Sequence, residues 1–131
     1  MKIFDCFMFY DEKILLDIRL NILNKFVDYF VIVESKYFHN GLKRELNFKM
    51  DDYSKFKDKI IYIVHENIPL KLENVDAADD EETKTYKFNF NAHTRENDQR
   101  NCIINGLKIA NNNDLILISD VDEIPNLENL N

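Results

Sequence analysis

Two aspartates separated by one residue, Asp120 and Asp122, are the residues of this sequence best suited to chemistry. They follow the apolar run 115–118, so both carboxylates come directly after a candidate buried strand. Hard divalent cations prefer carboxylate oxygens, and Mg²⁺ or Mn²⁺ held by one or two of them keeps positions open for phosphate oxygens. We therefore expect Asp120 and Asp122 to hold such a cation against a diphosphate. Spacing alone fits a solvated acidic turn equally well.

A second charged cluster lies upstream, in a segment with helical spacing. Arg95 and Glu96 stand close enough to Arg100 on a helix to present two cations and a carboxylate to an anionic ligand. Ordinary surface ion pairs are the alternative interpretation of this cluster.

Residue types and spacing exclude several other familiar sites. With only two glycines, the chain cannot form a glycine-rich phosphate-binding loop. Pro125 stands where an EF-hand loop beginning at Asp120 would need glycine. The histidines His39, His65 and His93 have no metal-ligand spacing, and we interpret them as structural or loop residues.

Composition predicts one globular domain in these 131 residues. The net charge of −7 and the sequence pI of about 4.9 argue against nucleic acid as a partner. Cys6 and Cys102 lie among apolar neighbours, and we expect two buried free thiols. No signal peptide or membrane-spanning segment is evident, so we expect a soluble, cytoplasmic protein.

Strand and helix patterns alternate along the chain. Apolar and β-branched runs predict strands at residues 3–9, 27–33, 59–64 and 115–118. Helical spacing or capping residues predict helices at residues 12–26, 51–59 and 94–110. Asp51 or Asp52 is the expected N-cap of the second helix, and Thr94 that of the third. The acidic stretch 70–91 has no clean period and is expected to be a loop or insertion with little regular structure.

The first helix is expected to pack one apolar face on the sheet. Leu15, Ile18, Ile22 and Leu23 fall at helical spacing and are predicted to face inward, with Arg19 on the opposite, solvated face.

This alternation predicts an α/β fold with an open, mostly parallel sheet. Ligands of such sheets bind outside the carboxyl ends of the strands. Tyr10 and Glu12 follow the first predicted strand and Glu34 ends the second, so we expect them to share a crevice with the aspartates and to contact the same ligand. Tyr10 could also touch a nucleobase.

Several segments together resemble glycosyltransferase family 17, in that family's order and over nearly the whole chain. The matching segments are Asp5–Glu12, Leu15–Leu20, Val27–Glu34, Arg95–Arg100 and Ser119–Pro125. The last of these contains the two aspartates.

The resemblance implies a fold, a donor and a reaction. The family is known for β-1,4-mannosyl-glycoprotein 4-β-N-acetylglucosaminyltransferases, which use UDP-N-acetylglucosamine and Mn²⁺ on a GT-A type fold and invert the anomeric centre. It implies that Asp122 ligates the metal, that Asp120 reaches the metal or the ribose, and that Glu123 supports both. Arg95, Glu96 and Arg100 would border the donor site, and the partners would be this nucleotide sugar and a glycan acceptor.

The carboxyl end departs from what the resemblance requires. Only six residues follow Pro125, whereas an inverting transferase also needs an acceptor surface and a general base. We therefore expect this sequence to be the donor-binding part of an enzyme truncated at the C-terminus, and no residue is assigned as the base.

Three alternatives remain. The first is a purely structural remnant, which would bind neither a nucleotide nor a divalent metal. The second is a module that binds a nucleotide sugar or metal without catalysis. The third is a haloacid-dehalogenase-like phosphatase, because residues 115–122 also resemble that family's strand and acidic pair, although the motif normally opens that fold.

Overall fold

A computed structural model describes residues 1–130 of the chain. Within this range the strands are β1 (Ile3–Phe9), β2 (Tyr29–Ser35), β3 (Ile60–His65) and β4 (Leu115–Ile118). The helices are α1 (Lys13–Leu23), η1 (Met50–Phe56), α2 (Glu81–Asn101) and η2 (Cys102–Gly106), of which η1 and η2 are 3₁₀ helices.

The four strands of the described range form one open, all-parallel sheet in the order β3, β2, β1, β4. The prediction of an α/β fold with an open parallel sheet is confirmed, and the arrangement is compatible with a GT-A type fold. Because all four strands run in one direction, their carboxyl ends meet at a single edge of the sheet.

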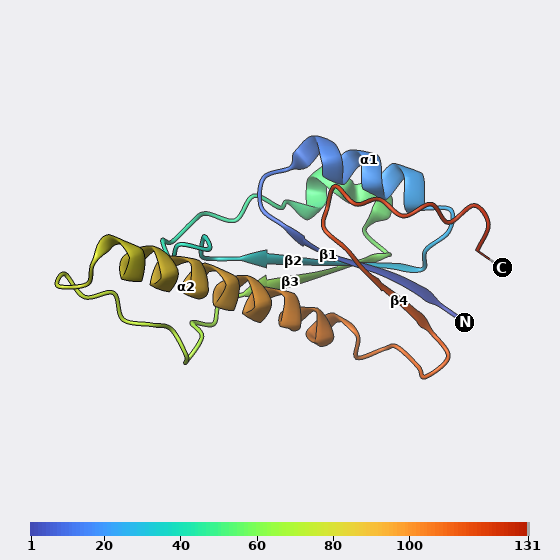
Figure 1. The fold of residues 1–131 in the computed structure, drawn as a ribbon. Helices are drawn as coiled ribbons and strands as arrows, with labels where there is room; N and C mark the ends of the chain where they lie inside the picture. Colours follow the sequence, from blue (N-terminus) through green and yellow to red (C-terminus); the bar gives the residue numbers. More distant parts are fainter. Residues whose placement is uncertain (131) are drawn as a thin grey trace.

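The central strand β1 is buried on both faces, and its alternating side chains divide between two cores. Phe7 and Phe9 join the core beneath α1 and η1, whereas Phe4 and Cys6 join the core on the face covered by η2 and the end of α2. Figure 1 shows α1 on one side of the sheet and α2 on the other. Side chains alternate between the two faces of a strand, so Asp5 lies on the same face as Phe7 and Phe9 and points toward α1.

The predicted inward face of α1 is wrong in part: Leu23 is buried and Leu15 packs against the core, but Ile18 and Ile22 do not face inward and Arg19 does. The buried residues of this helix are Leu16, Arg19, Leu20 and Leu23. The isoleucines Ile14, Ile18 and Ile22 are exposed instead. Apolar residues lie around most of this helix, so periodicity did not single out one face. Arg19 faces inward because its guanidinium pairs with Asp5 on β1.

The expected loop at 70–91 and the expected helix at 94–110 are also wrong in their bounds. One continuous helix, α2, begins at Glu81 and ends at Asn101, and η2 follows it. Asp80 is the N-cap, because its carboxylate accepts a hydrogen bond from the Thr83 amide at 2.7 Å. Acidic residues in the first turn also favour this helix start through the helix dipole.

The remaining cap predictions also fail. Thr94 lies inside α2, where its hydroxyl donates to the Phe90 carbonyl at 2.8 Å. Residue Lys49, rather than Asp51 or Asp52, caps η1, and it does so without a side-chain hydrogen bond.

Both cysteines are free thiols, as predicted. Cys6 is buried, and burial beside Asp5 raises the pKa of its thiol to about 12. Cys102 is only partly buried. None of the helices in the described range combines the length and the apolar character that crossing a lipid bilayer would require.

Close packing between η2 and the sheet depends on Gly106. A β-carbon at this position would lie 2.4 Å from Cγ1 of Val31 on β2. We expect Gly106→Ala to lower the free energy of unfolding by about 1–3 kcal/mol, because the extra methyl forces η2 away from the core. Urea denaturation of both proteins would measure this difference.

The exposed Asn101 at the end of α2 supplies the control. Asn101→Ala should change the unfolding free energy by no more than about 0.5 kcal/mol. If Gly106→Ala unfolds at the same urea concentration as the wild type, the close packing of η2 on β2 is not a constraint on this fold.

Candidate functional site

A cleft of about 530 Å³ opens at the carboxyl ends of β1 and β4. Its walls come from the segments that follow these strands, from the loop after β2 and from α2. The lining residues are Met8, Tyr10, Asp11, Glu12, Leu15, Phe38, His39, Glu96, Asp120, Val121 and Asp122. Five of the residues expected from the sequence to contact the ligand are therefore brought together here.

The acidic turn, residues 119–123, is closed by its own hydrogen bonds. The Glu123 amide donates to the Asp120 carbonyl at 2.9 Å, and the Asp120 amide donates to Glu123 Oε2 at 3.0 Å. The Ser119 hydroxyl donates to the Glu123 carbonyl at 2.9 Å. With the backbone fixed in this way, Asp120 and Asp122 keep exposed carboxylates on the cleft, and the Glu123 carboxylate supports the turn.

Arg19 holds this turn from inside the protein. Its Nη1 donates to the carbonyls of Asp120 at 2.5 Å, Val121 at 3.2 Å and Glu123 at 3.2 Å, and its Nη2 donates to the Ser119 hydroxyl at 2.6 Å. The side chain is fully buried. A residue of α1 therefore fixes the backbone that presents the two aspartates.

Asp5 on β1 compensates the buried charge of Arg19. The two side chains form a bidentate pair, with Nε to Oδ2 at 2.8 Å and Nη2 to Oδ1 at 2.7 Å, and both are fully buried. The guanidinium also lies over the Phe7 ring, 4.5 Å from its centroid. Sequence reasoning missed this pair. A carboxylate inside a strand that is otherwise continuously apolar was the signal that a buried cation had to be nearby.

The end of α2 forms another wall of the cleft and is tied to the acidic turn. Arg100 Nη2 lies 2.9 Å from Glu96 Oε1 and 3.6 Å from Asp120 Oδ1. Glu96 lines the cleft and Arg100 lies beside it, so the charged helix cluster and the aspartate pair adjoin, as the sequence suggested. This gives the acidic cleft a cation at its edge.

Tyr10, at the end of β1, is fixed by residues from two other elements. Its hydroxyl donates to Gln99 Oε1 of α2 at 2.5 Å and shares a hydrogen bond with His39 Nε2. Burial raises the pKa of the phenol far above its usual value, with Glu96 and Glu12 adding to the rise against the lowering by Arg44. The phenol is therefore protonated throughout the physiological range, and its one proton is donated to Gln99.

Glu12 lines the cleft and also orders the turn that contains it. Its Oε2 accepts hydrogen bonds from the amides of Tyr10 at 3.0 Å and Asp11 at 3.2 Å. This carboxylate thus positions the backbone after β1 and borders the cleft at once.

Glu34 does not face the crevice, so that prediction is wrong. Its side chain is fully buried and pairs with Arg44 at 2.9 Å. It also accepts hydrogen bonds from the amides of Asn47 and Phe48 and from the Tyr62 hydroxyl. Burial, together with this bond to Glu34, raises the pKa of the Tyr62 phenol. Glu34 therefore has no surface for a ligand and instead anchors the segment after β2.

Arg95 borders a second, smaller cavity of about 120 Å³ beside the cleft. Its Nη1 donates to the His39 carbonyl at 3.0 Å, and its guanidinium packs against Gly41, whose positive φ of 87° forms the loop turn. Deep in this cavity the Ser35 hydroxyl lies 2.8 Å from His65 Nδ1, and His65 Nε2 lies 2.6 Å from Asp98. His65 thus joins β3 to α2, in agreement with the structural role predicted for the histidines.

The aspartate pair could hold a cation only with help from a ligand. Among residues 1–130, no three His, Cys, Asp or Glu side chains are grouped closely enough to form a metal site by themselves. Asp120 and Asp122 do supply exposed hard oxygen ligands on one cleft wall, and Mg²⁺ or Mn²⁺ bound in this manner takes its other ligands from water and substrate phosphates.

Comparison with known proteins gives one match. The family model described as Glycosyltransferase family 17 matches residues 1–131, which is the whole chain. No curated protein and no solved structure matches it.

The buried pair of Asp5 and Arg19 generates a prediction that separates stability from positioning. Arg19→Met leaves the Asp5 carboxylate buried without its cation and should lower the free energy of unfolding by about 3–5 kcal/mol. The double variant Arg19→Met with Asp5→Leu removes both charges and should recover most of that loss. In the double variant the carbonyls of the acidic turn still lack their donor. Hydrogen exchange of the Glu123 amide should therefore remain faster than in the wild type.

Lys25→Met is the matched control, because it removes an equal charge from an exposed position just after α1. It should leave the free energy of unfolding and the exchange rate of the Glu123 amide unchanged. Wild-type protection of the Glu123 amide in the double variant would show that the turn is held by its own bonds and not by Arg19.

Proposed function

Because the chain belongs to glycosyltransferase family 17, we propose that its cleft binds UDP-N-acetylglucosamine, with the diphosphate at Asp120 and Asp122 and with Mn²⁺ or Mg²⁺ as the cofactor. Membership makes the protein a glycosyltransferase, whose substrates are a nucleotide-sugar donor and an acceptor. The proposal goes further in naming the donor, the metal and transfer with inversion to a β-1,4-mannosyl glycoprotein glycan.

The observation that carries the proposal is the acidic turn at the end of β4. Two exposed carboxylates line a cleft at the edge of the sheet where ligands of parallel α/β proteins bind. Their backbone is fixed in advance by Arg19, so little ordering is left to occur on binding. A protein of net charge −7 needs a cation to hold a diphosphate beside these carboxylates.

The donor set of the turn fits such a cation. What Mn²⁺ or Mg²⁺ would supply there is neutralisation of the charge that develops on the nucleotide as it leaves. Since the turn offers two carboxylates and the substrate offers phosphate oxygens, we expect weak binding of the metal alone and much tighter binding of metal and nucleotide together.

Other side chains of the cleft would act on the donor directly. Arg100 lies beside Asp120 and Glu96, where its guanidinium can contact a phosphate oxygen. The Glu12 carboxylate and the Tyr10 hydroxyl oxygen, both just after β1, can accept hydrogen bonds from sugar or ribose hydroxyls. Arg95 would contribute from the adjoining cavity.

The alternatives from the sequence are separable by experiment. A binding module would retain metal-dependent UDP binding and transfer no sugar. The phosphatase alternative has no support in the family match, which covers the whole chain.

Calorimetric titration of UDP and UDP-N-acetylglucosamine, with and without Mn²⁺, tests the proposal. We expect binding that requires Mn²⁺ and is weakened at least tenfold in Asp122→Ala, because one of two carboxylate ligands is lost. Transfer of labelled N-acetylglucosamine to a mannose-containing acceptor would then establish the reaction.

Asp52→Ala is the matched control, because it removes an equal charge from an exposed position on η1, outside the cleft. It should bind both ligands as the wild type does. Absence of UDP binding in the wild type, with or without Mn²⁺, would overturn the proposal. If Asp52→Ala weakens nucleotide binding as much as Asp122→Ala does, the change in net charge alone would account for the loss, and the two aspartates of the cleft would have no specific role.

A further inference from the structure

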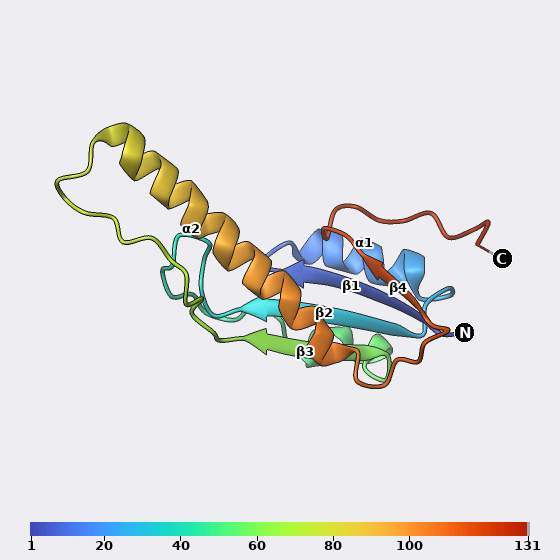
Figure 2. The same ribbon diagram turned by 60° about the horizontal axis from the view of Figure 1, so that its bottom comes forward.

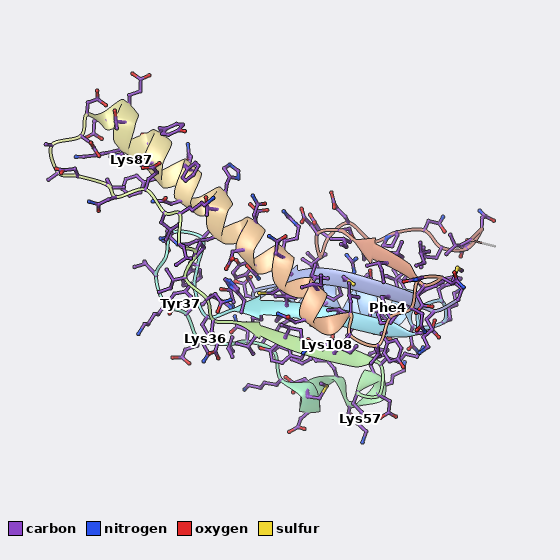
Figure 3. The ribbon with its side chains drawn as sticks, turned by 90° about the horizontal axis from the view of Figure 1, so that it is seen from below. Phe4, Lys36, Tyr37, Lys57, Lys87 and Lys108 are labelled. Carbon is purple, nitrogen blue, oxygen red and sulfur yellow. The ribbon has the colours of Figure 1, made fainter. Side chains whose placement is uncertain are left out.

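The first half of α2 projects past the carboxyl ends of the strands, as Figures 1 and 2 both show. We call residues 81–93 the arm. The loop 66–80 runs outward from the end of β3 alongside the arm and braces it. Asn91, which is buried, bonds both backbone groups of Glu73, and Lys87 bonds the Asn74 carbonyl and pairs with Asp79 at 2.7 Å. Figure 3 shows Lys87 on the side that faces this loop.

A different side of the arm carries exposed aromatic rings. Tyr86 is 65% exposed and Phe90 is 37% exposed, and their rings stack at a centroid distance of 6.3 Å. The side chain of His93, one turn further along, is 78% exposed. Spacing of four and three residues places all three on one face of the helix. We call Tyr86, Phe90 and His93 the aromatic stripe.

The aromatic stripe leads to the cleft. His93 Nδ1 lies 3.8 Å from Glu96 Oε2, and Glu96 lines the cleft. Arg100, a further turn along the same side, reaches Asp120. From Tyr86 to Glu96 the helix rises about 15 Å, so the stripe and the cleft wall form one continuous surface.

The residues around the rings suit a sugar better than another protein. Asn89 and Asn97 are exposed and lie on the same side of α2, so amide donors and acceptors flank the aromatic faces. Pyranose rings present an apolar C–H face bordered by hydroxyls, which such a surface complements. A helix that docks on a protein would show a wider, aliphatic stripe. The acidic start of the arm disfavours an anionic glycan.

We propose that the aromatic stripe binds the acceptor, a neutral oligosaccharide whose sugar rings lie along α2 while its terminal sugar enters the cleft beside Glu96 and Asp120. This proposal rests on the proposed function of the cleft. It adds a binding site for the second substrate, outside the donor residues.

The arm supplies its own control. Phe88 is 59% exposed but is turned by about 200° from Tyr86, so it lies on the opposite face of the same helix. Phe88→Ala therefore removes an exposed ring of comparable size from the same element without touching the stripe.

Titration of the mannose-containing pentasaccharide core of N-linked glycans, followed by NMR, tests the proposal in the presence of UDP and Mn²⁺. We expect Tyr86→Ala to raise the Kd of the pentasaccharide about tenfold, the size expected for loss of one stacked ring, and the double variant with Phe90→Ala to abolish binding. Phe88→Ala should change the Kd less than twofold. Because Tyr86 and Phe88 are mostly exposed, the thermal midpoints of their single variants should match the wild type.

Donor binding distinguishes this proposal from the previous one. UDP-N-acetylglucosamine should bind all the arm variants as it binds the wild type, since none of them changes the cleft. If the donor binds and the pentasaccharide does not, or if Phe88→Ala weakens it as much as Tyr86→Ala, the acceptor proposal is overturned. A concentration-dependent dimer that Tyr86→Ala dissociates would overturn it too, by assigning the stripe to a second copy of the chain.

Discussion

The backbone of the acidic turn takes its position from the buried pair between Asp5 and Arg19. Removing two charges from water costs free energy that only excellent geometry can offset, and here the guanidinium finds a bidentate carboxylate, a hydroxyl and three carbonyls. A well-packed apolar pair could give equal stability, but it could not donate to the carbonyls of Asp120, Val121 and Glu123. The pair therefore contributes position more than stability, since it joins β1, α1 and the acidic turn at one point.

A single segment of α2 makes the corresponding connection on the other face. Across residues 95–100 successive side chains reach different parts of the molecule: Asp98 contacts β3, Gln99 contacts β2 and Tyr10, and Arg100 contacts the acidic turn. Residues that a helical wheel presents as a generic charged surface thus have specific partners on other elements. Because these partners lie in the second halves of strands or just after them, the segment is fixed on the sheet beside the cleft, and the arm extends from a fixed base.

The sequence predicts strands better than it predicts which way side chains point. The bounds of β1 and β4 are correct because strands buried on both faces read as continuous apolar runs. The same rule placed Asp120 and Asp122 at the edge of the sheet. It also placed Glu34 there, wrongly, because strand ends fix a position along the chain and not the partner that will bury the side chain. For Glu34 that partner is Arg44, which lies in a loop without periodicity. For Arg19 it is Asp5, on another element.

The arm escaped prediction for a reason that also bears on its use. It packs little of its surface on the core, so it has no apolar period to recognise, and its helical state depends on local contacts. Asp80 caps the helix, and the acidic residues of its first turn interact favourably with the helix dipole. The loop 66–80 braces one side of the arm through Asn91 and Lys87. A helix stabilised in this way does not need its remaining faces for folding. Exposed aromatic rings on such a face contribute little to stability and lower the solubility of the protein. Their presence there is most simply explained if a ligand covers them.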